Sequence, residues 1–173
     1  AGQDIATFTG IMSSYRFSHS ASGLVVTDTL SGEGSDTLVD VETLSFSDGD
    51  LQVALVDGLY TLSGSALAES ITIDGTVGLA LAGGAGNDVL TGGTGDDIIT
   101  AGAGSDTITG GADSDTFVFN SVSGVDTIVD YSVADDSIQL SKAIFTGLGD
   151  IGALSSDEFA SGAGMTAAAD GTD

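Results

Sequence analysis

Apolar and polar residues follow a nine-residue period between Gly83 and Val118. Four consecutive blocks without insertions read GGAGNDVLT, GGTGDDIIT, AGAGSDTIT and GGADSDTFV. The eighth position of each block is a large apolar residue: Leu90, Ile99, Ile108 and Phe117. Because side chains alternate along a strand, we expect these residues to point inward while the flanking threonines, Thr91, Thr100, Thr107 and Thr109, face water. A single block cannot bury its own apolar residue, so the period predicts short strands stacked in a coil.

The first half of each block predicts a tight turn. Its first two positions are small and its fourth is usually glycine, which adopts turn conformations and lets backbone carbonyls approach closely. If turns alternate between the two sides of a flattened coil, the 83–88 turn stacks on 101–106 and the 92–97 turn stacks on 110–115. This stacking brings the sixth-position aspartates together in two pairs, Asp88 with Asp106 and Asp97 with Asp115.

Stacked carboxylates repel one another, and a hard divalent cation would remove that repulsion. Ca²⁺ takes about six to eight oxygen ligands in a flexible geometry, whereas Mg²⁺ requires tight octahedral geometry and gives up its waters reluctantly. The sequence therefore predicts about three to six calcium ions, held by carboxylates and turn carbonyls. The predicted ligands within the blocks are Gly84, Gly86, Asn87, Asp88, Gly93, Gly95, Asp96, Asp97, Gly102, Gly104, Asp106, Gly111, Asp113 and Asp115. The pattern is broken at Ala101, which replaces a first-position glycine, and at Asp113, which replaces a fourth-position glycine; the last block either binds differently or gains a ligand.

The four blocks resemble the calcium-binding nonapeptide of the RTX (repeats-in-toxin, hemolysin-type calcium-binding) family. That resemblance implies an all-β fold, a parallel β-roll or right-handed β-solenoid, with a small β-rich N-terminal module and a C-terminal capping segment. A flexible acidic linker would share the glycine and aspartate content. Linkers, however, do not hold an apolar residue at the eighth position of every nine.

Residues 1–60 form the predicted β-rich module that adjoins the repeats. Apolar stretches at 15–20 and 24–29 predict a hairpin, and a turn signal at 47–50 separates two further apolar stretches at 41–46 and 51–59. SGEGSDTLV at 31–39 matches the nonapeptide. The region resembles a β-rich module that accompanies RTX repeats. For its aspartates, Asp28, Asp36 and Asp48, ordinary turn capping and calcium binding both stay open.

Residues 61–141 form the predicted roll. Its first part, with GSALAESIT at 64–72 and DGTVGLALA at 74–82, resembles decayed repeats, which we expect to extend the roll as an N-terminal cap with little or no bound metal. After the fourth block, the 125–141 segment resembles the strands that close the roll in serralysin-type secreted proteins. Its carboxylates, Asp126, Asp130 and either Asp135 or Asp136, complete a last calcium site or only cap turns.

Residues 142–173 form the predicted C-terminal cap, with a short helix that starts at Ser155–Glu158 and a mobile Gly/Ala/Thr tail. A hydrophobic plug for the roll is predicted from four aromatic residues: Phe117, Phe119, Tyr131 and Phe145.

Composition narrows the choice of partner. The chain has 26 acidic residues against two basic ones, Arg16 and Lys142, and a formal charge of −24. This charge disfavours nucleic acid and anionic membrane surfaces as direct partners. No cysteine is present, so disulfides and thiolate metal sites are excluded, and no apolar run approaches the roughly 18 residues of a membrane span. The opening residues 1–4 resemble the middle of an acidic glycine turn, so we expect the sequence to belong to a longer chain.

Catalytic chemistry is not expected. His19 is the only histidine, and no serine lies in a G-x-S-x-G elbow. Carboxylates at nine-residue spacing are explained by metal binding. Any enzyme activity would then belong to sequence outside this chain.

The resemblance implies a calcium-binding module of a type I-secreted protein, extracellular or at the bacterial cell surface, that folds on calcium binding after export. The parent protein could be an exoenzyme such as a protease or lipase, a cytolysin, or a large adhesin or surface-layer protein. An alternative role is calcium-mediated self-assembly, or adhesion through surface polysaccharide. Expected partners are calcium ions, the type I secretion machinery and these self or polysaccharide surfaces.

Overall fold

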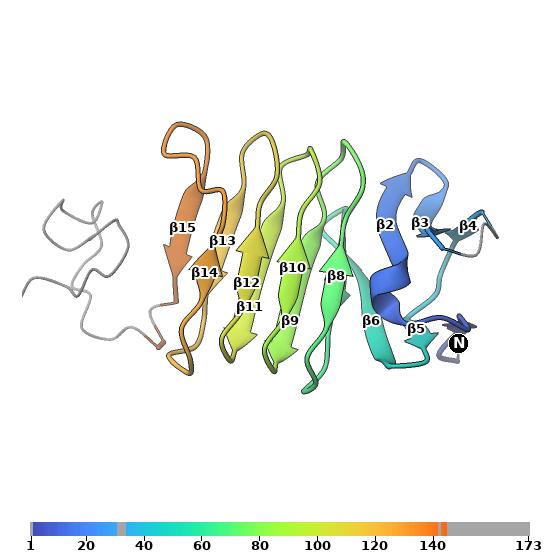
Figure 1. Ribbon diagram of the computed structural model, residues 1–173. Coiled ribbons are helices and arrows are strands. Elements are labelled where there is room, and N and C mark those ends of the chain that lie inside the picture. Colours follow the sequence, from blue (N-terminus) through green and yellow to red (C-terminus); the bar gives the residue numbers. More distant parts are fainter. Residues whose placement is uncertain (1, 31–33, 142, 145–173) are drawn as a thin grey trace, which may run out of the picture.

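Short parallel strands stack along most of the molecule in two facing sheets (Figure 1). The computed structural model describes residues 2–30, 34–141 and 143–144. Within these residues the largest sheet has eight strands, in the order β1 Ile5–Thr7, β5 Thr43–Phe46, β6 Gly49–Val56, β7 Leu59–Ser63, β9 Ala80–Ala85, β11 Ile98–Ala103, β13 Thr116–Phe119 and β15 Ser137–Leu140. The facing sheet consists of β14 Thr127–Ile128, β12 Thr107–Thr109, β10 Val89–Thr91 and β8 Ser70–Thr72.

The apolar eighth positions form two ladders in register, one in each sheet. In the larger sheet the partners are Leu62, Leu81, Ile99, Phe117 and Ile138. In the facing sheet they are Ile71, Leu90, Ile108 and Ile128. The members from Leu62 to Phe117 are buried, and Ile128 packs against them. Each block therefore stacks on the block two before it, as the nine-residue period predicts. The structure is a parallel β-solenoid of the expected all-β class.

The roll extends beyond the regular repeats in the N-terminal direction. The blocks at 64–72 and 74–82 supply β8 and β9, which confirms that they are structural repeats. The larger sheet then continues through β7, which pairs parallel with β9, and through β6 and β5, which pair antiparallel. The boundary at residue 60 stays a prediction, and one sheet runs across it.

The N-terminal region adds a second small sheet against the end of the roll. Strands β2 Tyr15–Ser20, β3 Gly23–Asp28 and β4 Ser35–Leu38 pair antiparallel, after a short 3-10 helix, η1 Met12–Ser14. The predicted hairpin of β2 and β3 is confirmed, and the predicted turn at 47–50 lies between β5 and β6. The apolar stretch at 51–59 is divided between two strands, because Asp57 and Gly58 adopt positive φ angles of 53° and 89° and turn the chain between β6 and β7.

The nonapeptide match at 31–39 does not form a turn of the roll. Its described part, residues 34–39, contains β4, which pairs antiparallel with β3. The hydrophobic core nevertheless passes without interruption from the N-terminal region into the roll. Phe17 of β2 is fully buried and forms a parallel bridge with Ile73, at the end of β8.

Two closing strands, β14 and β15, cover the C-terminal end of the regular repeats. Tyr131 and Phe119 pack against the core, and the rings of Phe117 and Tyr131 lie 6.1 Å apart. The expected aromatic plug is therefore present in these three residues. Phe145, the helix expected at 155–158 and the tail lie outside the described residues.

Candidate metal centre

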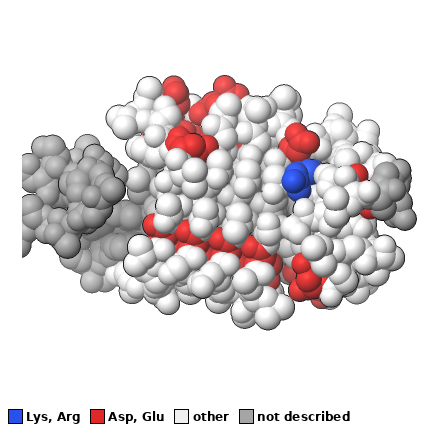
Figure 2. Space-filling model, viewed as in Figure 1, with Lys and Arg blue, Asp and Glu red and all other residues white. Residues whose placement is uncertain are grey.

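The sixth-position acids stack in two columns, one along each side of the roll. Column A precedes the strands of the smaller facing sheet and contains Glu69, Asp88, Asp106 and Asp126. Column B precedes strands β11, β13 and β15 and contains Asp97, Asp115 and Asp136. Figure 2 shows an unbroken row of acidic atoms along the side of the roll from which β8, β10, β12 and β14 start in Figure 1.

One carboxylate oxygen of each aspartate in the two columns accepts a hydrogen bond from the backbone. In column A the amide nitrogens of Glu69, Asp88 and Asp106 donate to Oδ1 of the next acid along the column, at 2.8, 2.9 and 3.0 Å. In column B the amides of Leu79, Asp97 and Asp115 do the same, at 2.8, 3.0 and 3.0 Å. These bonds hold each aspartate carboxylate against the backbone of the preceding turn in its column, about one strand spacing away.

Three of the four acids in column A have one carboxylate oxygen without a partner. Glu69 Oε2, Asp88 Oδ2 and Asp106 Oδ2 are buried and accept no hydrogen bond. A buried, unpaired carboxylate oxygen is costly, by about 1–3 kcal/mol or more. Backbone donors are already committed to the ladder, so a cation is the partner that this arrangement fits.

First-position glycines keep a second kind of oxygen close to these carboxylates. A Cβ built at Gly83 would collide with both Asp88 Oδ2 and the carbonyl oxygen of Ala101, which belongs to the next turn on the same side. A Cβ at Gly92 would collide with the carbonyl oxygen of Gly110 in the same way and would also meet Asp97 Oδ2. Carboxylate and carbonyl oxygens from successive turns therefore converge, and this donor set suits Ca²⁺.

The electrostatics favour a bound cation as well. Burial raises the pKa of Asp88 to about 6, with further increases from the charges of Glu69 and Asp106, although the Glu69 amide lowers it. Burial likewise raises the pKa of Asp115 to about 6, and it raises the pKa values of Asp97 and Asp126. Each shift means that the ionised carboxylate is disfavoured without a counter-ion. A divalent cation between two such groups would restore the ionised state.

Residues 82–117 match the model of the RTX calcium-binding nonapeptide repeat, in four copies. This segment is an array of RTX repeats. RTX repeats bind calcium and are typical of secreted bacterial proteins. A search of curated proteins found no match to the chain.

Not all predicted ligands of the RTX repeats point into the columns. Asn87 Oδ1 and Asp96 Oδ1 lie on the exposed rim, where they accept hydrogen bonds from the amides of Ser105 and Ser114 at 2.9 and 3.0 Å. Asp113 is also exposed and adopts a positive φ of 71°, the glycine-like conformation of the position that it occupies. The side chains of Asn87 and Asp96 therefore hydrogen-bond the next turn of the RTX array from outside.

The glycines predicted to line the turns fall into two conformational groups. Positive φ angles between 102° and 142° occur at Gly84, Gly86, Gly102, Gly104 and Gly111. Gly93 and Gly95 of the second RTX repeat do not share this conformation. Instead, the amide of Gly93 donates to Asp97 Oδ2 at 2.8 Å, so both oxygens of this column B acid are satisfied.

The carboxylates that follow the RTX repeats have distinct positions. Asp126 and Asp136 continue columns A and B, so of the two alternatives at 135 and 136 only Asp136 has the sixth-position geometry. Asp130 lies elsewhere and accepts hydrogen bonds from the amides of Gly110 and Gly111, each at 2.9 Å. It therefore closes the last turn of the RTX array by capping two backbone donors.

No group of three or more His, Cys, Asp or Glu side chains suited to a metal ion occurs in the part of the chain that the structure describes. This finding agrees with the column geometry, because each space between turns of the RTX array borders only two carboxylates. Backbone carbonyls would have to supply the other oxygens. The sequence places Glu69 at the aspartate position of its block, with Ile71 at the eighth position, but Glu69 is not among the predicted ligands.

The N-terminal aspartates serve the backbone outside the RTX array. Asp28 Oδ1 accepts a hydrogen bond from the Leu30 amide, and Asp48 Oδ1 accepts one from the Met12 amide, each at 2.8 Å. Asp36 is exposed on β4, opposite Val26. Asp28 therefore caps a local turn, whereas Asp48 caps the first residue of η1; calcium binding by either stays a prediction.

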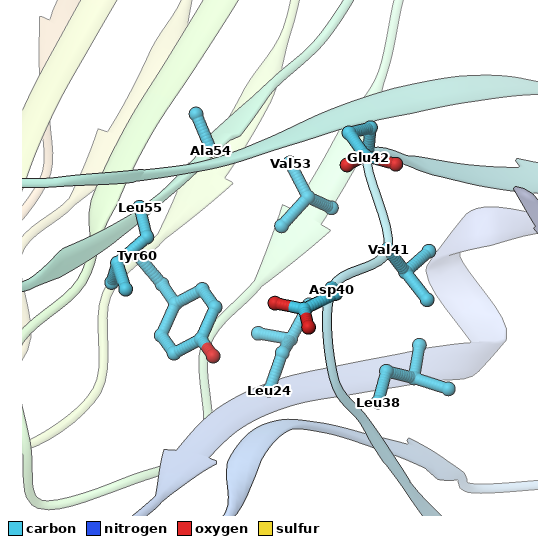
Figure 3. A pocket seen from close by; sticks show the side chains of 9 residues that line it. All are labelled: Leu24, Leu38, Asp40, Val41, Glu42, Val53, Ala54, Leu55 and Tyr60. Carbon is cyan, nitrogen blue, oxygen red and sulfur yellow. The ribbon is translucent and has the colours of Figure 1, made fainter. Parts of the chain in front are cut away.

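A cavity of about 310 Å³ lies in the N-terminal region, far in sequence from the RTX repeats. Figure 3 shows the carboxylate of Asp40 and the ring of Tyr60 pointing toward it, between apolar side chains of β3, β4 and β6. Its second carboxylate, Glu42, accepts a hydrogen bond from the Asp4 amide at 2.8 Å. Both acids come from one loop rather than from stacked turns, so this cavity does not reproduce the RTX geometry.

Among the described residues, no helix is long and apolar enough to cross a membrane.

Proposed function

We propose that this chain is a calcium-dependent folding module of a bacterial protein exported by a type I system. The observation that carries the proposal is the pair of acid columns, in which Asp88 and Asp106 each bury an oxygen without a partner. The RTX match to the same turns identifies calcium as the cation. Calcium binding would then supply the free energy that folding lacks.

The physical basis is the balance between charge repulsion and ion binding. The chain carries a formal charge of −24, and its columns place carboxylates one turn apart inside the protein. Without calcium the buried charges repel one another and favour the unfolded chain, which also suits passage through a secretion channel. Millimolar calcium outside the cell would neutralise the columns and allow the short strands to stack.

The columns support a count of ions within the expected range of about three to six. Four neighbouring pairs occur among the predicted ligands: Asp88 with Asp106, Asp106 with Asp126, Asp97 with Asp115, and Asp115 with Asp136. One ion in each space between paired acids gives about four, each with two carboxylates and additional carbonyl oxygens.

Far-ultraviolet circular dichroism of the purified chain tests this function. In chelator we expect the spectrum of an unfolded chain, and in millimolar calcium we expect strand signal. Magnesium at equal concentration is the matched control, because its demand for octahedral geometry should prevent the transition. Identical spectra in chelator and in calcium would overturn the proposal.

We further propose that the module has no catalytic activity of its own. His19, the only histidine, packs against the Tyr60 ring at 5.6 Å on the surface of the N-terminal region. Its Nδ1 lies 3.4 Å from the Ser20 carbonyl oxygen. This environment gives the imidazole a structural role.

A further inference from the structure

We propose that the turn at 64–69, which lies outside the matched repeats, forms an additional calcium site with Asp88, and that Glu69 replaces the usual aspartate. The inference rests on the proposed calcium-dependent function and extends it by one site. It also reverses the expectation that this block binds little or no metal.

Glu69 is a buried acid with an incomplete set of partners. Its side chain is only 6% exposed, and Oε2 has no hydrogen-bond partner. Its other oxygen, Oε1, accepts a hydrogen bond from Ser65 Oγ. Across the space between turns, Asp88 is 1% exposed and its Oδ2 is also unpartnered. Two unpaired oxygens from facing carboxylates require a shared partner.

The protein offers no positive side chain to fill this role among the described residues. Arg16 is the only described basic residue of the two in the sequence, and its guanidinium donates to the carbonyl oxygens of Ser13 and Tyr15. A metal ion or a shared proton are therefore the two candidates. Of these, only the metal ion also uses the surrounding carbonyl oxygens.

Backbone geometry at Glu69 matches that of the regular repeats. The Val89 amide donates to the Glu69 carbonyl at 2.9 Å, as the Thr107 amide donates to the Asp88 carbonyl at 2.8 Å. The Glu69 amide donates to Asp88 Oδ1, as the Asp88 amide donates to the next acid. Strand β8 is also in register with β10. The turn therefore has the hydrogen bonds and register of an RTX turn, although Ser65 and Leu67 lack the positive φ of Gly84 and Gly86.

The carboxylate and carbonyl oxygens that lie beside the first-position glycine of a regular repeat are also present in this turn. A Cβ at Gly64 would collide with the Gly83 carbonyl oxygen and would lie 2.9 Å from Glu69 Oε2. At Gly83, the same point is bordered by Asp88 Oδ2 and the Ala101 carbonyl oxygen. Carboxylate and carbonyl oxygens thus converge in both turns. The flexible coordination distances of Ca²⁺ tolerate the extra methylene of glutamate, whereas the tight geometry of Mg²⁺ does not.

The test counts calcium ions bound by the full 173-residue chain, by equilibrium dialysis with metal analysis, in wild type and three variants. Glu69→Gln keeps the shape but removes the charge, and we expect it to bind one ion fewer than wild type. Glu69→Asp restores the usual ligand and should bind the wild-type number. Glu42→Gln makes the same charge change outside the roll and should leave the count unchanged.

The outcomes separate this inference from the function on which it rests. If wild type binds no calcium, the proposed function fails. If wild type binds several ions and Glu69→Gln binds the same number, only the additional site is wrong. Should Glu69→Gln not fold, a crystal structure of the wild-type chain in calcium decides the matter. An ion between Glu69 and Asp88 supports the site, and ions confined to the other turns overturn it.

Discussion

Columns A and B are built from the same nonapeptide, yet they present different numbers of free oxygens. Column A runs from Glu69 to Asp126 without a gap, and its first three acids each bury one unpartnered oxygen. Column B begins with an apolar residue, Leu79, where an acid would stand, and the next member, Asp97, has both oxygens hydrogen-bonded. The side of the roll that carries column A (side A) therefore has more buried oxygens for a cation to satisfy than the side that carries column B (side B).

The difference originates in the conformation of the turns. On side A the second and fourth residues of both regular repeats have positive φ, between 102° and 142°. On side B the 110–115 turn shares the positive φ, at Gly111 and Asp113, but the 92–97 turn lacks it, and its Gly93 amide donates to Asp97 instead. A repeat consensus thus sets where an acid stands, whereas the local turn decides whether a backbone amide or a cation becomes its second partner.

The largest effect should come from the tightest turn contact of side A. In Gly104→Ala the new Cβ would collide with the Gly86 carbonyl oxygen, at a residue whose φ is 142°. We expect a loss of about 1–3 kcal/mol from backbone strain and about 1–3 kcal/mol from overlap. Urea unfolding in saturating calcium measures the sum.

Gly95→Ala is the matched substitution on side B, at the same position of its repeat. Its Cβ would lie 2.5 Å from the Gly78 nitrogen, but the backbone φ is not positive, so only the overlap cost applies. Gly58→Ala separates the strain cost, because Gly58 has a φ of 89° and no atom within 4 Å of the new Cβ. Equal losses at Gly104 and Gly95 would contradict the difference between the sides.

Charge removal should affect calcium binding more on side A. Asp88→Asn keeps the Oδ1 acceptor for the Glu69 amide, but removes a charge that lies between two acids, Glu69 and Asp106. Asp97→Asn removes a charge that lies between Leu79 and only one acid, Asp115. We expect Asp88→Asn to raise the calcium midpoint at least about tenfold, or about 1.4 kcal/mol, and Asp97→Asn to raise it less.

Asp88→Asn should reverse its effect in chelator. Without calcium it removes a buried charge whose Oδ2 has no partner, so the calcium-free roll should become more stable than wild type. Asp97→Asn should gain less, because its amide NH2 would replace an oxygen that accepts a hydrogen bond from the Leu79 or Gly93 amide. Circular dichroism during calcium titration gives both quantities. A larger midpoint shift for Asp97→Asn than for Asp88→Asn would show that column B, and not column A, dominates binding.

The sequence predicts the roll well because its nine-residue period follows directly from the stacking of successive turns. Apolar residues such as Ile99 recur at the spacing that places them in one ladder, and the aspartates follow. The hydrogen-bond partners of the polar side chains are harder to predict from the sequence. The period could not show that Asn87 and Asp96 accept hydrogen bonds at the rim, or that the Gly93 amide satisfies Asp97, because these depend on turn dihedrals.

The N-terminal region shows a second limit of local pattern. SGEGSDTLV has the letters of a repeat, but its described part contributes an antiparallel strand. GSALAESIT departs further from the consensus and yet stacks as a full turn. In each case the neighbouring strand determines how the segment pairs. Strand β8 pairs parallel with β10 of the roll, whereas β4 pairs with β3 in the separate three-stranded sheet.

The smallest effect should be a pH dependence that both columns share. Burial raises the pKa of Asp88 on side A and of Asp115 on side B from 3.8 to about 6. A carboxyl group whose folded pKa is raised binds its proton more tightly in the folded state. Its contribution to stability is therefore present below about pH 4 and is lost as the pH rises through about 6.

We accordingly expect the calcium-free chain to gain about 1 kcal/mol from each of these two groups between about pH 7 and about pH 5. Calcium should bind more weakly over the same interval, because protons compete for the same oxygens. Because the chain is expected to be unfolded in chelator alone, circular dichroism in chelator with a stabilising osmolyte, recorded at each pH, measures the first effect. Calcium titration at each pH measures the second. Asp88→Asn should remove about half of the gain and Asp115→Asn the other half, since protons, unlike calcium, require only one carboxylate and so do not distinguish the columns. A calcium-free stability that is independent of pH in this range would show that these carboxylates are already ionised and solvated, and the electrostatic case for a cation between the turns would then fail on both sides.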